Sequence, residues 1–323
     1  MSDLPRKIQI NEEGPREGFQ FEKGPIATAR KIALIDSLSE TGLNQIQVAS
    51  FVNPRTVPGM ADADDVVRGF ARQPGIRYTA LWLNEKGLQR ALASGRLDVK
   101  GSLSLTASEV FLKRNQNRSM AEDVAAERSI AKMYRDHSVP VERTSIRAAF
   151  GCNYEGDVAS AQVVALIGQL IAIAQDHGFT IRLVSLADTM AWATPAAIKR
   201  LVGAVRETYP ELAIGLHLHD TRGMGIANAY AGLEMGVSIF DSSVAGLGGC
   251  PFAGHRGAAG NVCTEDLVFM CDEMGIETGV DLQKLIASAV LAEEVVGHPL
   301  PGSVMRGGSL APLRAAARLA ASA

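Results

Sequence analysis

Two histidines separated by a single residue, His217 and His219, follow an apolar run at residues 212–216. Side chains two apart on a strand point to the same face, so this pair is able to grip one metal ion. Further along, Cys250 comes directly after two glycines, and Asn261 follows soon after it. A cysteine on a glycine-rich loop and an amide oxygen nearby would complete a reaction centre. The histidine pair alone is weak evidence, because buried histidines more often bond to the backbone.

The composition describes a globular protein with a large core. Of the 323 residues, 47% are hydrophobic, which is ample for packing and argues against disorder. The net charge of −3 gives no reason to expect nucleic acid, whose binders usually carry a basic stripe. No apolar run reaches the length of a membrane span, and the first residues lack the features of a secretory signal. We therefore expect a cytoplasmic protein without nucleic-acid or membrane partners.

The four cysteines, Cys152, Cys250, Cys263 and Cys271, show no paired spacing such as C-x-x-C. In a chain of this size without a secretory signal, free thiols are expected rather than disulfides. Cys263 and Cys271 fall on a helical pattern and are interpreted as structural.

Apolar runs alternate with helical patterns along the chain. The predicted strands are residues 7–12, 45–51, 78–83, 99–105, 145–150, 180–186, 212–218 and 238–244. Helical patterns lie between them, for example at residues 28–40, 120–135, 159–176, 194–208 and 224–235. Thr194 before Pro195 is a capping hydroxyl ahead of a first-turn proline, and Gly42 and Gly236 stand where helices should end.

Eight strand-then-helix units in a chain of this size match a (β/α)8 TIM barrel, with an open doubly wound sheet as the competitor. The residues able to do chemistry decide between the two folds, because all of them end or follow predicted strands. They are Arg16, Glu17, Asn53, Thr106, Asp188, His217, His219 and Cys250. In a barrel, the carboxyl ends of the strands form the face that carries the active site. We predict one catalytic barrel domain over residues 1–323, with a C-terminal helical extension from about residue 280 packed on it.

Five segments of the chain resemble hydroxymethylglutaryl-CoA lyase. They are residues 13–20 (EGPREGFQ), 50–54 (SFVNP), 217–221 (HLHDT), 241–251 (DSSVAGLGGCP) and 260–267 (GNVCTEDL). The likeness covers most of the chain, and the stretch around Cys250 is long and highly specific. That family consists of metal-dependent TIM-barrel lyases. The resemblance implies a retro-Claisen cleavage of a 3-hydroxy-3-methyl acyl-CoA, in which hydroxymethylglutaryl-CoA gives acetyl-CoA and acetoacetate.

The resemblance also implies a metal site and an acyl-CoA partner. The ligands would be Glu17, His217, His219 and Asn261. A set of carboxylate, imidazole and amide oxygen suits Mg²⁺ or Mn²⁺ better than an ion that prefers thiolates. A homo-oligomer, a dimer or higher, is expected.

The catalytic residues implied by the resemblance are Arg16, Glu17, Asp188 and Cys250. Arg16 would stabilise enolate charge on the thioester oxygen. Cys250 would act as acid or base at the enolate carbon, and Asp188 would orient substrate and protons. Taken alone, Arg16 and Glu17 would be a solvated pair, Cys250 a core thiol and Asp188 a helix cap. The surrounding motifs favour the site.

Three departures from the family pattern concern the substrate. Glu17 stands where the family has aspartate, Gln47 replaces a strand-two carboxylate, and the loop from Cys250 to Asn261 is two residues longer and contains Arg256. We interpret these changes as altered specificity. The alternatives are a lyase for a related thioester such as citramalyl-CoA, which would give acetyl-CoA and pyruvate, and a non-catalytic acyl-CoA-binding barrel. A condensing enzyme such as isopropylmalate synthase also carries a His-x-His strand, but the loop around Cys250 favours the lyase.

Overall fold

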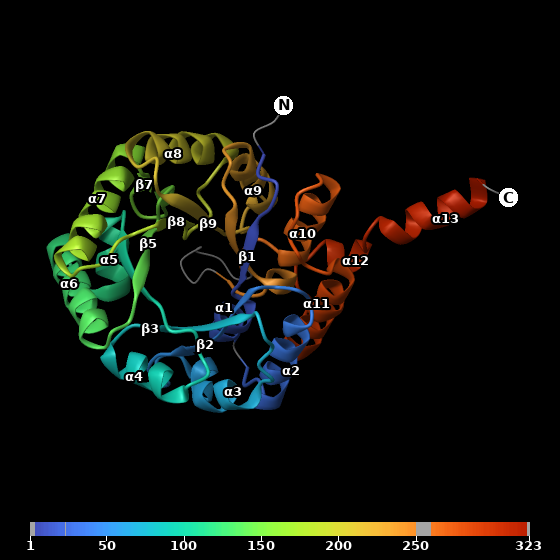
Figure 1. Ribbon diagram of the computed structural model, residues 1–323, viewed down its shortest axis with the longest axis horizontal. Helices are drawn as coiled ribbons and strands as arrows, with labels where there is room; N and C mark the ends of the chain where they lie inside the picture. Colours follow the sequence, from blue (N-terminus) through green and yellow to red (C-terminus); the bar gives the residue numbers. More distant parts are fainter. Residues whose placement is uncertain (1–3, 23, 250–259, 322–323) are drawn as a thin grey trace.

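The computed structural model describes residues 4–22, 24–249 and 260–321. Eight parallel strands form a ring in the order β3-β2-β1-β10-β9-β8-β5-β4, with helices packed outside it (Figure 1). The strands are β1 (Gln9–Glu12), β2 (Gln45–Phe51), β3 (Arg77–Trp82), β4 (Gly101–Thr106), β5 (Val141–Arg147), β8 (Leu183–Asp188), β9 (Ala213–Leu218) and β10 (Ile239–Ser242). The predicted (β/α)8 barrel with C-terminal helices is confirmed, and the open doubly wound sheet is excluded.

Most helices connect successive strands of the ring (Figure 1). They are α2 (Thr28–Ser39), α3 (Ala63–Gly69), α4 (Glu85–Ser94), α5 (Glu109–Gln116), α6 (Met120–Asp136), α7 (Ser160–Asp176), α8 (Pro195–Thr208) and α9 (Gly225–Glu234). After β10 come α10 (Thr264–Glu273), α11 (Leu282–Val296), α12 (Val304–Gly307) and α13 (Ala311–Ala321), the last of which extends away from the barrel (Figure 1). None of the described helices has the length and apolar character needed to cross a bilayer.

Smaller elements stand where strands pass into loops. The short helix α1 (Gly14–Phe21) begins directly after β1, and a 3-10 turn, η2 (Val244–Gly246), follows β10. Another 3-10 turn, η1 (Pro58–Met60), lies between β2 and α3. Beyond β5, the strands β6 (Gly151–Cys152) and β7 (Gly156–Asp157) form an antiparallel pair.

Helix boundaries follow the local chemistry of the sequence. The side chain of Thr194 accepts a hydrogen bond from the backbone N–H of Ala197 at 3.2 Å, so it caps α8 as predicted. Gly42 and Gly236 follow α2 and α9 with φ angles of 91° and 71°. That left-handed conformation is costly for residues with a Cβ, which is why glycine stands there.

The predicted position of the fifth strand, residues 145–150, is wrong. The observed strand, β5, runs over Val141–Arg147, because Ala148 adopts a φ of 53° and ends the extended run. The apolar residues after it are buried in a turn instead. Alternate residues of β5, among them Arg143, face the barrel interior, so a charged residue stands in the first half of this strand. Arg143 Nη2 lies 2.8 Å from Asp241 Oδ2 on β10, and two strands separate β5 from β10 in the ring.

The ring has a seam between β3 and β4, the two ends of the strand order. Near the amino-terminal end of β4, Asp98, three residues before that strand, bridges the seam: Asp98 N donates to Tyr78 O at 2.8 Å, and Tyr78 N donates to Asp98 Oδ2 at 3.0 Å. Higher up, Glu127 of α6 fills the gap by accepting a hydrogen bond from Ser104 N at 2.9 Å. Helix α6 therefore supplies polar groups to the wall of the barrel.

A buried carboxylate ties β1 to the elements that follow β10. Glu12 accepts hydrogen bonds from Gly14 N at 2.7 Å, Val244 N at 2.9 Å and Thr264 Oγ1 at 2.6 Å. Its side chain is fully buried, and this burial raises the pKa of Glu12 to about 7. One side chain thus fixes the starts of α1, η2 and α10 relative to one another.

We expect Glu12→Ala to lower the free energy of unfolding by about 3 kcal/mol, because three buried donors lose their acceptor. Urea denaturation of the metal-free protein measures the change. Glu211→Ala, at an exposed acid, is the matched control and should have little effect. An unchanged denaturation midpoint for Glu12→Ala would mean that packing alone holds these elements together.

Candidate metal centre

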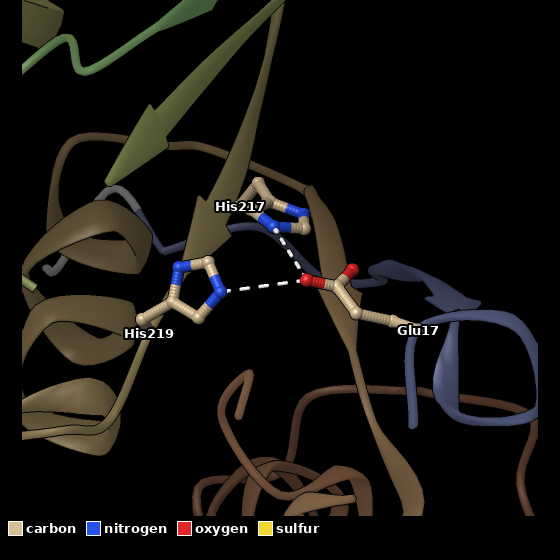
Figure 2. Close-up of side chains that lie close together, drawn as sticks. All are labelled: Glu17, His217 and His219. Carbon is tan, nitrogen blue, oxygen red and sulfur yellow. Dashed lines mark ion pairs between the residues drawn. The ribbon is translucent and has the colours of Figure 1, made fainter. Parts of the chain in front are cut away.

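Three side chains converge at the carboxyl end of the barrel strands: Glu17, His217 and His219 (Figure 2). One ligand atom of each lies within 4.8 Å of the others. Glu17 Oε1 is 3.4 Å from His219 Nε2 and 3.9 Å from His217 Nε2. Glu17 comes from α1, which starts immediately after β1, while His217 lies on β9 and His219 directly follows that strand. The spacing that the sequence suggested thus brings both imidazoles to one carboxylate.

Hydrogen bonds on the far side of each ring set the tautomers of the two histidines. His219 Nδ1 lies 2.9 Å from the backbone oxygen of Asp188, and His217 Nδ1 lies 3.3 Å from Asp241 Oδ2. A carbonyl or carboxylate oxygen only accepts, so Nδ1 carries the proton in each case. In the neutral form of each ring, Nε2 therefore presents its lone pair toward Glu17, which is the arrangement that a metal-binding histidine needs.

Asn261 adds an amide group to this cluster. Its Nδ2 donates to Glu17 Oε2 at 3.3 Å, whereas its Oδ1 is buried and accepts no hydrogen bond among the described residues. Backbone bonds on either side hold it beside β9: Val262 N donates to Leu218 O, and Asp220 N donates to Gly260 O. A buried amide oxygen without a donor is costly unless something else binds it. A divalent cation fits this donor set of carboxylate, two imidazoles and amide oxygen.

The electrostatics of the cluster are those of a compact charge network. Burial would raise the pKa of Glu17, but Arg16 and the two histidines hold it well below its usual range. Burial lowers the pKa of His217, yet its hydrogen bond to Asp241 and the charge of Glu17 raise it to about 9. Asp241 is held ionised, with a lowered pKa, mainly by Arg143 despite its burial. A cation entering the site would replace the proton that His217 otherwise carries.

Arg16 lies against the metal cluster. Its Nη2 is 3.1 Å from Glu17 Oε2, and it also pairs with Glu13 and donates to Gln47 Oε1. Burial lowers the pKa of Arg16, but Glu17 and Glu13 outweigh this effect and raise it. The sequence analysis missed Glu13, which stands at the start of α1 and is buried. Its position three residues before Arg16, on the same helical turn, was the available signal.

Asp188, at the end of β8, uses one carboxylate oxygen for structural hydrogen bonds and leaves the other oxygen without one among the described residues. Its Oδ1 accepts hydrogen bonds from Trp192 N at 2.7 Å and Ala193 N at 3.0 Å, which shapes the loop before α8. Its Oδ2 is buried and accepts none among the described residues. Burial raises the pKa of Asp188 to about 6 even though these backbone N–H groups lower it. One oxygen of this carboxylate is therefore left to exchange a proton near neutral pH.

Cys250 lies outside the described residues, as do His255 and Arg256. The residues that flank this segment lie at the site. A Cβ built on Gly248 would lie 3.6 Å from Gly260 Cα and 3.7 Å from Glu17 Cγ. Glu17 is therefore close to the point where the chain leaves the described structure and the point where it returns.

Other residues from the sequence analysis have structural partners. Asn53 Oδ1 accepts from Arg55 N at 3.0 Å and forms a turn after β2. Cys152, Cys263 and Cys271 are buried free thiols, which confirms the expectation of no disulfide for these three. A second residue was missed: Asp241, one position before the end of β10, orients His217.

Comparison with known proteins gives a consistent picture. The HMGL-like family model matches residues 7–291. The mitochondrial hydroxymethylglutaryl-CoA lyase of Rattus norvegicus is 44% identical over 286 residues, which are 88% of this chain and 85% of that protein. Hydroxymethylglutaryl-CoA lyase YngG of Bacillus subtilis is 40% identical over 297 residues, or 92% of this chain and 96% of that protein.

Solved structures extend the likeness to the fold. The crystal structure of hydroxymethylglutaryl-CoA lyase from Pseudomonas aeruginosa superposes with a TM-score of 0.84 at 40% identity, covering 99% of this chain and 100% of that one. An HMG-CoA lyase from Acinetobacter baumannii, in complex with coenzyme A and 3-methylmalate, gives a TM-score of 0.83 at 35% identity. That match covers 96% of this chain and 97% of that one.

We expect metal binding to release about one proton per site near pH 7.5, because the metal must displace the proton of His217. With a pKa of about 9, His217 is protonated in the metal-free protein below that pH and neutral above it. Apparent affinity for Mn²⁺ should therefore rise about tenfold per pH unit from pH 7 and level off above pH 9. Calorimetry in buffers of different ionisation enthalpy measures both quantities.

Asp241→Asn removes the carboxylate that supports the His217 imidazolium, so this variant should release less than about half a proton per site near pH 7.5. Asp65→Asn, at an exposed carboxylate on α3, is the control. Mn²⁺ binding that is independent of pH in the unsubstituted protein would contradict the assignment of His217 as a ligand.

Proposed function

The chain belongs to the HMGL-like family, and on that premise we propose that it is a divalent-metal-dependent carbon–carbon lyase that cleaves hydroxymethylglutaryl-CoA to acetyl-CoA and acetoacetate. The observation that carries the proposal is the convergence of Glu17, two correctly oriented imidazoles and the unbonded Asn261 Oδ1 beside Arg16. A barrel that only bound acyl-CoA would have no need for this set.

The metal site consists of Glu17, His217, His219 and Asn261 in this proposal. Bound there, Mg²⁺ or Mn²⁺ supplies Lewis acidity that lowers the pKa of the substrate's 3-hydroxyl. Asp241 and the backbone oxygen of Asp188 keep the imidazoles aimed at Glu17.

Asp188 is proposed to accept the proton of the 3-hydroxyl on its unbonded Oδ2. A carboxylate with a pKa of about 6 is mostly ionised at neutral pH and still basic enough to take that proton. The C2–C3 bond then breaks, its electron pair passes to the thioester as an enolate, and the C3 oxygen becomes the ketone of acetoacetate.

Arg16 and Cys250 are proposed to complete the reaction. Arg16 is a fixed cation held by Glu13 and Gln47, so it opposes developing negative charge on the thioester oxygen without having to reorganise. Cys250 would donate its proton to C2 of the enolate and form acetyl-CoA. Gly248, two residues before Cys250, lies beside Glu17, which supports this role.

The departures at Glu17 and Gln47 are compatible with activity. Glu17 reaches both histidines from α1 despite its extra methylene. Gln47 accepts from Arg16 Nε, and the nearby carboxylate of Glu13 supplies negative charge to the same guanidinium. The charge balance around Arg16 is therefore kept by a different residue.

A related thioester is the second candidate. One structural relative was solved with coenzyme A and 3-methylmalate, a hydroxy diacid other than hydroxymethylglutarate. Together with the departures at Glu17 and Gln47, this ligand makes citramalyl-CoA, which would give acetyl-CoA and pyruvate, the alternative substrate to test.

The proposed function predicts acetyl-CoA release from hydroxymethylglutaryl-CoA with Mg²⁺ or Mn²⁺ and none with excess EDTA. A panel of hydroxymethylglutaryl-CoA and both enantiomers of citramalyl-CoA measures the preference. Faster release from citramalyl-CoA would move the assignment to the second candidate. Silence across the panel in the metal-loaded protein would favour the non-catalytic barrel.

Arg16→Met should lower kcat about 10²- to 10³-fold with little change in KM, because its charge is needed only as the enolate forms. Steady-state kinetics on hydroxymethylglutaryl-CoA measure the effect. Arg68→Met, at an exposed arginine on α3, is the control. A change confined to KM would make Arg16 a binding residue instead.

A further inference from the structure

Arg147 is a cation at the mouth of the barrel that the proposed reaction does not use. It is the last residue of β5. Alternate residues of a strand share a face, so Arg147 points to the same side as Arg143. That side is the barrel interior, because Arg143 reaches across it to Asp241 on β10. The Arg147 side chain is 26% exposed.

The groups around Arg147 are incompletely bonded. Asp123 on α6 is only 1% exposed, yet neither of its carboxylate oxygens accepts a hydrogen bond among the described residues. Its cationic neighbours, Arg147 and Arg118, stand at 3.7 and 3.8 Å, too far for hydrogen bonds. Arg147 Nε and the hydroxyl of Thr106, on the adjacent strand β4, are also buried and have no hydrogen-bond partner within the described part of the chain. Several orphaned polar groups at one spot indicate a site for a polar ligand.

Two other arginines at the barrel interior, Arg16 and Arg143, are paired with carboxylates. Glu17 and Glu13 raise the pKa of Arg16, and Asp241 raises that of Arg143. For Arg147 the balance is reversed: burial lowers its pKa more than Asp123 and Glu127 raise it. Arg147 therefore lacks the full anionic partner that its two neighbours have.

The two acids near Arg147 both lie on α6, and neither neutralises its positive charge fully. Asp123 and Glu127 are four residues apart and share one helix face. Glu127 is occupied by Ser104 N in the seam between β3 and β4, and burial raises its pKa to about 7. Burial also raises the pKa of Asp123. Neither acid gives Arg147 the close, bidentate partner that a guanidinium accepts best.

The strand register places Arg147 within reach of a substrate on the metal. Ile146 pairs with Leu186 of β8, and Ala187 of β8 pairs with His217 of β9. Arg147 is thus two strands from His217, roughly 10 Å at the backbone given the spacing of neighbouring strands. Both side chains point inward from these positions.

We propose that Arg147 binds the carboxylate at the end of the acyl group remote from the thioester, with Asp123 as its positioning residue. This inference rests on the proposed function and adds to it the residue that recognises the terminal carboxylate of the substrate. The guanidinium fork matches a carboxylate bidentately, which gives both affinity and orientation. Binding would supply the acceptor that Arg147 Nε now lacks.

The test compares two thioesters of equal acyl length. Glutaryl-CoA carries the terminal carboxylate and valeryl-CoA does not, and neither has a 3-hydroxyl to be cleaved. In the Mg²⁺-loaded protein we expect glutaryl-CoA to bind about 10- to 100-fold more tightly, the scale of hydrogen bonds to a charged group. Arg147→Met should remove most of that ratio by weakening glutaryl-CoA alone. Calorimetry measures both dissociation constants.

Two further variants keep the test decisive. Arg147→Lys retains the positive charge but not the bidentate guanidinium, so its ratio of the two dissociation constants should be intermediate. This variant also provides the test if Arg147→Met fails to fold. Asp123→Asn should reduce the ratio less than Arg147→Met, again through glutaryl-CoA only. Arg182→Met is the matched control, because Arg182 is an exposed arginine (73%) that lies just before β8, at the opposite end of the barrel.

Two results would overturn the proposal. If both Arg147 variants keep the ratio of the unsubstituted protein, Arg147 does not read the carboxylate. If glutaryl-CoA and valeryl-CoA weaken equally, Arg147 serves the CoA half that the two ligands share. Because the readout is binding of ligands that cannot react, it remains valid if hydroxymethylglutaryl-CoA is not cleaved. Failure of the proposed function and failure of this inference are therefore distinguishable.

Discussion

Charged groups inside a barrel must be paired, and most of this structure follows from that constraint. Glu17 is buried, and it is held ionised by Arg16 and by two imidazoles. Burying a carboxylate without such partners would cost several kcal/mol, or would protonate it and end its use as a ligand. The same groups that stabilise the charge of Glu17 are those that would hold a cation and an enolate. Folding and chemistry therefore draw on one network.

Charge pairing behind the metal ligands also orients their side chains. Asp241 holds His217 on one side and is itself bonded by Arg143 and Asn11. Because Asp241 accepts a hydrogen bond from Nδ1–H, the Nε2 lone pair of the neutral ring faces Glu17. A ligand set in a barrel thus depends on residues that never touch the metal. Arg147, by contrast, is left with an incomplete partner, and that deficit is the basis for assigning it a substrate group.

The scaffold fixes these groups through a few long-range ties. Glu12 connects the end of β1 to the segment after β10 and to α10, so Glu17 and Asn261 are held on either side of one buried carboxylate. The seam between β3 and β4 is filled by Glu127 of α6 instead of a complete strand ladder. Because Glu127 takes the place of strand hydrogen bonds there, polar side chains of an outer helix reach the barrel interior.

The sequence by itself determined the barrel, the helix ends at Thr194 and Gly42, and the shared face of His217 and His219. These features depend on periodicity and on local backbone chemistry, which neighbouring residues specify. Only the tertiary structure decided that Glu13 and Asp241 belong to the site, and that β5 begins at Val141 and contains Arg143. A polar side chain becomes a core residue only when a distant partner meets it, as Asp241 meets Arg143 across the barrel. No pattern in the residues around Arg143 or around Asp241 predicts their contact, because the two are far apart in the sequence.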